Sequence, residues 1–146
     1  MILSKKNIEL YQIQANKKSN KLIYHNKKKI YVFADLYMLN TILRNLIINA
    51  VKFSSNSDIF IDANVEMNLC FISIKDTGIG IKPGRIENLF KIEKTYSTIG
   101  TNKEKGSGLG LNICKEFIEK NGGTITVKSQ INVGSTFTFT LPVINT

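Results

Sequence analysis

The sequence predicts an α+β fold, a two-layer sandwich with helices on one face of a mixed, mostly antiparallel sheet. Residues 36–53 carry apolar side chains at every third or fourth position, which is the spacing of an amphipathic helix. Short runs with strand character, such as residues 58–65 and 69–75, follow one another in pairs. Because strands and helices are grouped rather than strictly alternating, helices covering one face of an antiparallel sheet are favoured.

Length and composition fit one globular domain, residues 1–146. Hydrophobic residues make up 42% of the chain and charged residues 21%, which argues against disorder or a fibrous repeat. The sequence contains no apolar run long enough to cross a bilayer and no apolar stretch of the signal-peptide kind at its start. We therefore expect a cytoplasmic location for this chain, whether or not a parent protein is anchored in a membrane.

The net charge of +9 is concentrated near the N-terminus. Residues 1–30 hold eight lysines and one acid, which leaves twelve basic and ten acidic residues over residues 31–146. Aromatic and basic residues are not interleaved as in RNA-binding modules, so no nucleic-acid partner is expected. This basic segment is either a solvated face or a docking surface for a partner domain or an anionic ligand.

The first third of the chain has the pattern of short strands joined by Lys- and Asn-rich turns. Residues 8–13 alternate apolar with polar side chains, as residues 22–24 and 30–33 do more loosely. Asp35 stands where a helix N-cap belongs. The helix that follows is expected from Leu36 to Phe53, with an apolar stripe at Leu39, Leu43, Leu46, Ala50 and Phe53.

After the strand pair comes a loop in which residues 76–84 hold three of the ten glycines and one of the two prolines. The remaining elements are expected to be a short helix around 85–90, a lid over Lys91–Lys105, a helix over about 108–121 that ends at Asn121-Gly-Gly, and strands at about 124–129 and 135–141. Cys70 and Cys114 are far apart in sequence and are predicted to be buried thiols in a reducing compartment rather than metal ligands.

Three segments contain the residue types of a nucleotide site. On the long helix, Asn45, Asn49 and Lys52 lie on one side, at positions i, i+4 and i+7. Asparagine is a poor helix former, and its amide needs a partner on so apolar a helix. A magnesium-bound triphosphate would supply one, because an amide oxygen is a hard ligand. Capping of a neighbouring loop by the two asparagines is the alternative.

The second segment is Asp76-Thr-Gly78-Ile-Gly80, and the third is Gly106-Ser-Gly108-Leu109-Gly110-Leu111 at the start of a helix. A carboxylate at Asp76 could accept a hydrogen bond from an exocyclic amine such as that of adenine, while the two glycines let the backbone approach a flat ring. Backbone N–H groups at a helix start favour phosphate. Taken alone, each is also compatible with an ordinary tight turn or helix N-terminus.

In combination, order and spacing, these segments resemble the N box and the two glycine boxes of the sensor histidine kinase catalytic domain. That domain has the Bergerat ATP-binding fold, shared with type II topoisomerases and mismatch-repair ATPases. The similarity runs from about Ile8 to Pro142, and residues 43–54 resemble the histidine kinase form of the N box. The pattern of residues 122–129 and 134–142 agrees with it.

The resemblance implies a role for each matching position. Asn49 would coordinate Mg²⁺, while Asn45 and Lys52 would approach the phosphates of ATP. Asp76 would bind the adenine amine in a pocket shaped by Gly78 and Gly80. Phosphate binding and anchoring of the lid would fall to Gly106, Gly108, Leu109 and Gly110. The family's phenylalanine box is only partly matched, by Leu89-Phe90, because Glu93 stands at its second aromatic position.

The resemblance also implies partners. No two-helix dimerisation segment with a phosphoacceptor histidine precedes the domain in this sequence, and His25 lies in a strand-like stretch. We therefore expect a monomeric piece of a longer kinase, which binds Mg-ATP and phosphorylates a histidine on a separate dimerisation domain, with a response regulator downstream. The alternatives are an anti-sigma-factor-type serine kinase of the same fold and a non-catalytic nucleotide-binding regulatory module.

Overall fold

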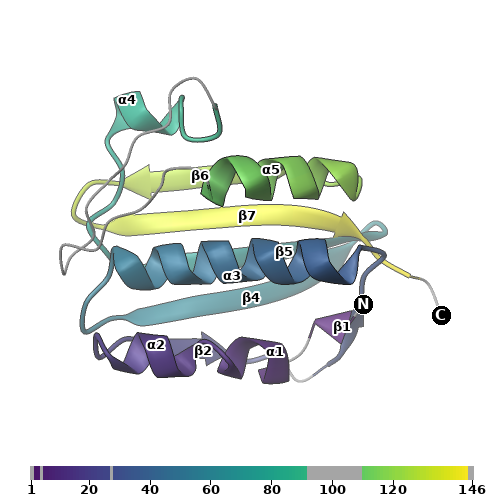
Figure 1. Cartoon of the computed structure of the whole chain (residues 1–146), viewed down its shortest axis with the longest axis horizontal. Coiled ribbons are helices and arrows are strands. Elements are labelled where there is room, and N and C mark those ends of the chain that lie inside the picture. Colours follow the sequence, from purple (N-terminus) through teal and green to yellow (C-terminus); the bar gives the residue numbers. More distant parts are fainter. Residues whose placement is uncertain (1, 4, 27, 92–109, 145–146) are drawn as a thin grey trace.

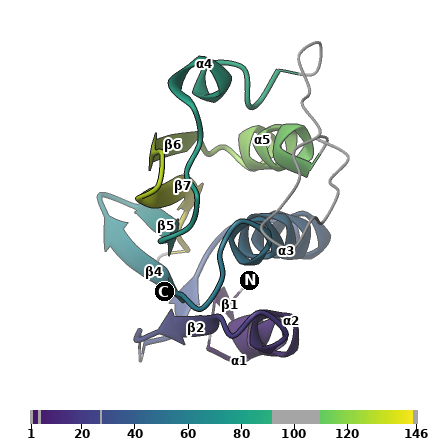
Figure 2. The same cartoon turned by 90° about the vertical axis from the view of Figure 1, so that its left-hand side faces the viewer.

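The computed structural model describes residues 2–3, 5–26, 28–91 and 110–144. In these residues the chain forms two layers, with the helices on one side of a five-stranded sheet except the short helix at residues 83–86, which lies beyond one edge of the sheet (Figures 1 and 2). The elements in chain order are β1 (Ile2–Leu3), α1 (Lys5–Glu9), α2 (Gln12–Asn16), β2 (Lys21–Tyr24), β3 (Ile30–Tyr31), α3 (Leu36–Lys52), β4 (Asp58–Glu66), β5 (Leu69–Asp76), α4 (Pro83–Ile86), α5 (Gly110–Lys120), β6 (Ile125–Gln130) and β7 (Gly134–Pro142).

The sheet has the strand order β2-β4-β5-β7-β6. Its pairs are antiparallel except β2 with β4, which run parallel from the Lys21–Asp58 pair to the Tyr24–Ile61 pair. Strands β1 and β3 form a separate antiparallel pair. The prediction of a mixed, mostly antiparallel sheet with helices on one face is confirmed.

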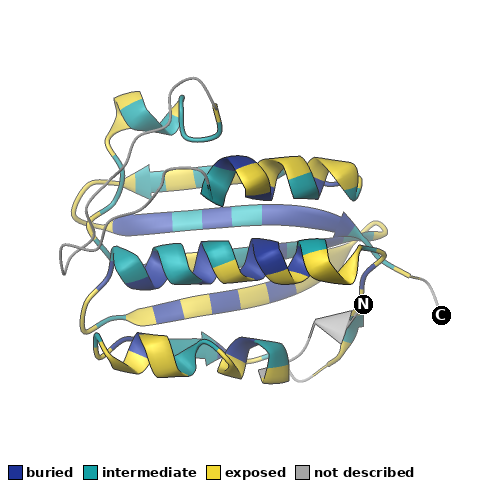
Figure 3. Cartoon of the chain, in the orientation of Figure 1, coloured by how far each residue is buried: buried dark blue, intermediate teal, exposed yellow. Residues whose placement is uncertain are grey.

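Helix α3 lies across the middle of the sheet because its apolar stripe faces the strands. Its buried residues include Leu39, Leu43 and Leu46, which are at most 1% exposed, and Figure 3 shows the alternation of buried and exposed turns along it. The Asp35 side chain accepts a hydrogen bond from the Met38 amide at 2.8 Å, so the predicted N-cap is confirmed. The helix ends at Lys52, with Phe53 as its C-cap.

Substituting Asp35 tests this cap. Asp35→Ala should lower the free energy of unfolding by about 1 kcal/mol, because the Met38 amide loses its partner. Asp35→Asn should stay close to the wild type, since asparagine caps helices about as well. Urea unfolding of the three proteins measures the difference, and equal losses for both variants would contradict a capping role.

The prediction of a strand over residues 8–13 is wrong. That stretch contains the end of α1 and the start of α2, which pack beside β2 (Figure 1). Ile8 and Ala15 are buried at 2% and 0% exposure, whereas Leu10 and Ile13 are both 72% exposed. The buried residues, together with half-buried Tyr11, follow helical spacing, and the short apolar alternation has no structural counterpart.

Two other boundaries differ from expectation. The short helix expected at residues 85–90 is α4, Pro83–Ile86, because residues beyond it continue in turns such as Asn88 N–H to the Arg85 carbonyl. The strand expected at residues 30–33 is only Ile30–Tyr31, followed by an isolated bridge from Val32 to Val143. By contrast, α5 ends as predicted, with the Gly123 amide bonded to the Ile118 carbonyl.

The core lies between the sheet and α3 and α5, and both cysteines are free and buried within it, as predicted. Burial raises the pKa of the Cys70 thiol to about 11. His25 is exposed just after β2. Across the described residues, no helix has both the length and the apolar character needed to span a membrane.

Candidate functional site

The C-terminal half of α3 carries the predicted polar stripe. Asn45, Asn49 and Lys52 are all partly exposed, whereas Leu46 and Ala50 between them are buried. None of the residues that the structure describes hydrogen-bonds to the Asn49 carboxamide, so that group is available to a ligand. The Lys52 ammonium lies 5.0 Å from the centroid of the Phe53 ring, a cation–π contact at the end of the helix.

Asp76 ends β5 in the centre of the sheet and is only 5% exposed. Its Oδ1 accepts hydrogen bonds from the Gly78 amide at 2.9 Å and from the Ser135 amide at 3.3 Å. Among the described residues, both hydrogen bonds to this carboxylate are accepted by Oδ1, which leaves Oδ2 available to a ligand. Burial raises the pKa of Asp76, and the Gly78 and Ser135 amides partly offset that rise.

The loop after Asp76 is tied to two other parts of the chain. The Ile79 amide donates to the Phe53 carbonyl at 3.1 Å, at the end of α3. On the other side, the Asn132 amide donates to the Ile79 carbonyl at 2.8 Å, in the turn between β6 and β7. These bonds fix the loop and with it the Asp76 side chain.

The structure explains why residues 78 and 80 are glycines, apart from any approach of the backbone to a flat ring. A Cβ at Gly78 would overlap the Phe53 carbonyl oxygen, and one at Gly80 would overlap the Gln130 carbonyl oxygen. Gly80 also has φ +73°, in the left-handed region that favours glycine. The missing side chains are therefore required by the protein's own backbone.

The start of α5 contacts the N-box residue Asn45. A Cβ built on Gly110 would lie 3.6 Å from the Asn45 Cγ atom, an ordinary van der Waals distance. Helix α3 thus contacts the Gly78 loop at its C-terminal end and the start of α5 at Asn45, and Figure 2 shows α3 and α5 side by side on the sheet. Gly106, Gly108 and Leu109, and the predicted lid from residue 92 onward, lie outside the described residues.

Sequence reasoning missed one supporting residue. Ser135 is buried and donates its amide to Asp76. Its only sequence signal is the position directly after the turn glycine Gly134. Phe90, the matched aromatic residue of the phenylalanine box, packs edge-on against Phe137 with ring centroids 6.5 Å apart, so this residue is anchored to the sheet through β7.

Comparison with family models gives a match over residues 34–145 to the histidine kinase-, DNA gyrase B-, and HSP90-like ATPases. The chain belongs to this family. The curated relatives that it matches include a sensor protein and a sensor histidine kinase. It is 34% identical to the sensor protein SrrB of Staphylococcus aureus over 97% of this chain, and 39% identical to the sensor histidine kinase WalK of Bacillus subtilis over 79% of this chain.

Solved structures of similar shape include a histidine kinase and a protein in complex with a nucleotide analogue. Full-length ShkA in complex with AMPPNP is 26% identical, with a TM-score of 0.79 over 97% of this chain and 29% of ShkA. The mycobacterial sensor histidine kinase MprB, at 21% identity and a TM-score of 0.80 over 100% of this chain and 99% of that chain, supports the fold alone. The chain spans only 24% of SrrB and 19% of WalK, so it corresponds to one part of such proteins.

Proposed function

We propose that this chain is the ATP-binding catalytic domain of a two-component sensor histidine kinase, one domain over residues 1–146 with a lid at residues 91–105. The observation that carries the proposal is Asp76, a buried carboxylate with one oxygen fixed by two backbone amides and the other available. Such a group suits an exocyclic amine, which donates and cannot accept. The AMPPNP complex of ShkA, a 26% identical chain, supports ATP as the ligand.

In this proposal, different residues of the site bind different parts of the nucleotide. Asp76 binds the adenine amine, next to the loop that Gly78 and Gly80 hold in place. Asn45 and Lys52 contact the phosphates. The glycine-box residues Gly106, Gly108, Leu109 and Gly110 are proposed to bind phosphate as well, through backbone N–H groups.

Magnesium fits the side chains of α3. The Asn49 carboxamide offers a hard oxygen ligand, is partly exposed, and has no hydrogen bond among the described residues. When bound, Mg²⁺ neutralises phosphate charge and orients the γ-phosphoryl group. We propose Asn49 as its protein ligand, with waters and phosphate oxygens in the other positions.

The reaction follows from this arrangement. The domain holds the γ-phosphoryl group in line with a histidine of a separate dimerisation domain of the parent kinase, and a response regulator then receives it. Positioning and charge neutralisation are the contributions that phosphoryl transfer needs. The name of the relative WalK, a sensor histidine kinase, favours histidine over serine as the acceptor. The chain acts in the cytoplasm and is monomeric by itself.

Titration with a non-hydrolysable ATP analogue tests the proposal. We expect calorimetry to show binding that Mg²⁺ strengthens. In Asn49→Ala the strengthening by Mg²⁺ should fall by roughly tenfold, while adenosine binding stays measurable, because only the metal ligand is lost.

Asn40→Ala is the matched control, since Asn40 is exposed on the same helix and away from the stripe. It should leave the effect of Mg²⁺ unchanged. No heat or chemical-shift response of the wild type at millimolar analogue would refute nucleotide binding. An unchanged Mg²⁺ effect in Asn49→Ala would remove the metal role alone.

A further inference from the structure

We propose that the outward face of α1 and α2 docks on an anionic phospholipid bilayer, through lysines that meet the headgroups and two aliphatic side chains that enter the interface. The face consists of Lys6, Leu10, Ile13 and Lys17, which we call the α1–α2 stripe. Helices α1 and α2 pack beside β2, at one edge of the sheet (Figures 1 and 2). The inference goes beyond the proposed function, because no residue of the stripe belongs to the nucleotide site.

The two short helices follow one helical path, so their residues can be placed on faces. The Tyr11 amide donates to the Ile8 carbonyl at 3.0 Å, and the Ala15 amide donates to the Tyr11 carbonyl at 3.2 Å. The four stripe residues are separated by four, three and four positions. At 100° per residue they fall within about 60° of one another. Ile8, Tyr11 and Ala15 point the other way and pack against the core.

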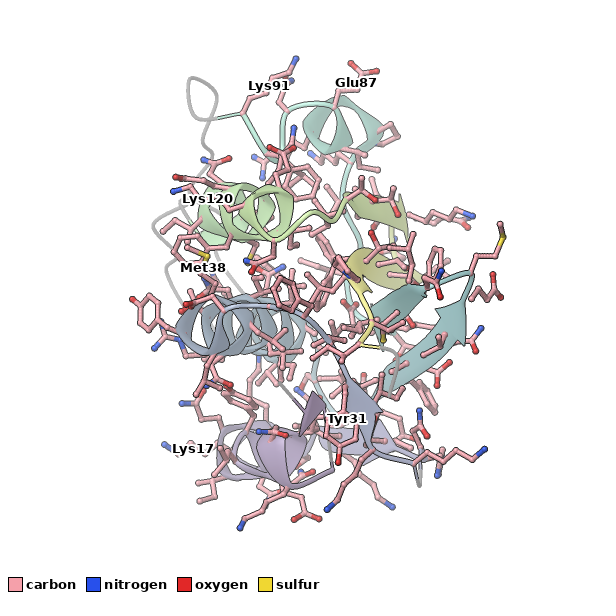
Figure 4. The ribbon with its side chains drawn as sticks, turned by 90° about the vertical axis from the view of Figure 1, so that its right-hand side faces the viewer. Lys17, Tyr31, Met38, Glu87, Lys91 and Lys120 are labelled. Carbon is pink, nitrogen blue, oxygen red and sulfur yellow. The ribbon has the colours of Figure 1, made fainter. Side chains whose placement is uncertain are left out.

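The stripe is exposed along its whole length. Leu10 and Ile13, one turn apart, are each 72% exposed. Lys6 and Lys17 are also exposed and form no ion pair with a described residue. In Figure 4, Lys17 extends outward from α2, on the side away from the sheet. Adjacent aliphatic side chains in water, bordered by charged residues, are typical of an interaction surface.

The charge around the stripe is carried by lysine alone. Residues 1–30 hold eight lysines, no arginine and one acidic residue, Glu9. Lys21 on β2, and Lys28 and Lys29 in the segment after it, are exposed at the edge of the molecule where α1 and α2 lie. A lysine is a point charge on a flexible stem, which suits mobile phosphate headgroups. The planar fork of arginine is better suited to fixed carboxylates of a protein.

This combination selects a bilayer among anionic partners. A nucleic acid backbone would bind the lysines but would leave Leu10 and Ile13 without apolar contacts. A second copy of the chain would bring like charges together. At a bilayer surface, the two aliphatic side chains enter the acyl boundary, while the lysine stems lie along it with their ammonium groups at the level of the phosphates. The stripe is roughly 16 Å long, so the helices would lie in the plane of the interface.

Co-sedimentation with vesicles tests the proposal. The chain should bind vesicles of equal parts phosphatidylglycerol and phosphatidylcholine, should not bind phosphatidylcholine alone, and should bind more weakly as salt is raised. Replacing both stripe lysines, Lys6→Gln with Lys17→Gln, should weaken binding roughly tenfold or more. Leu10→Gln with Ile13→Gln should do the same, because the apolar anchor is lost.

A charge-matched control separates the stripe from the net charge. Lys82→Gln with Lys128→Gln removes two exposed lysines that lie outside the stripe, and it should weaken binding by about twofold at most. Urea unfolding should place all these variants close to the wild type, since the substituted side chains are exposed. An absence of binding to the anionic vesicles would overturn the inference, and so would a loss in this control as large as that of Lys6→Gln with Lys17→Gln.

Tryptophan fluorescence measures insertion directly, because the chain has no tryptophan of its own. In Leu10→Trp, the anionic vesicles should shift the emission to shorter wavelength and protect it from a water-soluble quencher. Met67→Trp is the control and should not respond, since Met67 is 94% exposed in the turn between β4 and β5. An unchanged emission in Leu10→Trp would overturn insertion. Equal protection by soluble poly-glutamate would overturn the bilayer in favour of an acidic protein partner.

Discussion

Asp76→Asn should weaken binding of a non-hydrolysable ATP analogue by roughly 100-fold or more. The substitution keeps one oxygen for the Gly78 and Ser135 amides and replaces the outward oxygen by an NH₂ group. In the proposed complex that NH₂ group would face the adenine amine, so that two donors would meet without an acceptor. Loss of a hydrogen bond to a charged acceptor costs about 1.5–3 kcal/mol, and the unpaired donors add to it. Calorimetric titration at neutral pH measures the change.

The same variant should be as stable as the wild type or slightly more stable. Burial raises the pKa of Asp76 in the folded state above that in the unfolded chain. Ionised Asp76 therefore costs stability above the folded pKa, and the cost disappears as the pH falls and the carboxyl group is protonated. The stability advantage of Asp76→Asn should shrink on acidification, while the wild type loses analogue affinity over the same range.

Asp62→Asn is the matched control, because Asp62 is an exposed carboxylate on the neighbouring strand β4. It should change neither analogue affinity nor its dependence on pH. Analogue binding by Asp76→Asn within about threefold of the wild type would contradict a role for the carboxylate in base recognition.

Local sequence patterns were sufficient to predict the long helices and strands. The apolar stripe of α3 spans 17 residues, enough for helical spacing to stand out from chance. Its start was predictable because Asp35 caps it, and the end of α5 because glycines follow Asn121. In strands β4 and β5, which have 9 and 8 residues, buried side chains alternate with more exposed ones along most of the strand.

Short segments could not be predicted in the same way. Residues 8–13 hold only six positions, so a period of two and a period of 3.6 fit them about equally well. The decisive residue was Ala15, which is fully buried and continues the helical spacing of Ile8 and Tyr11. Its burial depends on the packing of α2 against β2 and α3, which no local pattern specifies.

The residues of the site were predictable as residue types, whereas their contacts were not. Gly78 and Gly80 are needed because Phe53 and Gln130, both far away in sequence, approach them with their backbones. The hydrogen bond from the Cys114 thiol to the Ile42 carbonyl joins two helices and could not be predicted from either segment alone. Such contacts are set by the strand order and the helix packing, so they appear only with the tertiary structure.

Gly80→Ala is expected to lower the free energy of unfolding by about 3–4 kcal/mol. A Cβ here meets the backbone of Gln130 and Ile131, and backbone cannot rotate away as a side chain can, so overpacking costs about 1–3 kcal/mol. An alanine at φ +73° adds about 1–2 kcal/mol of conformational strain. The hydrogen bonds that flank Gly80, from Asn132 to Ile79 and from Ile81 to Ser129, should weaken as the loop moves outward.

Gly84→Ala provides the control for Gly80→Ala. A Cβ at Gly84 has no atom within 4 Å, and the residue lies in α4, where alanine is favoured over glycine by up to about 1 kcal/mol. Urea unfolding should therefore show Gly84→Ala at or above the wild type and Gly80→Ala far below it. At a temperature where Gly80→Ala remains folded, its analogue affinity should still be reduced, because the same loop follows Asp76 and donates the Gly78 amide to it. Equal stability of the two variants would show that the loop can yield at Gly80, and its rigidity would then not be what holds Asp76 in place.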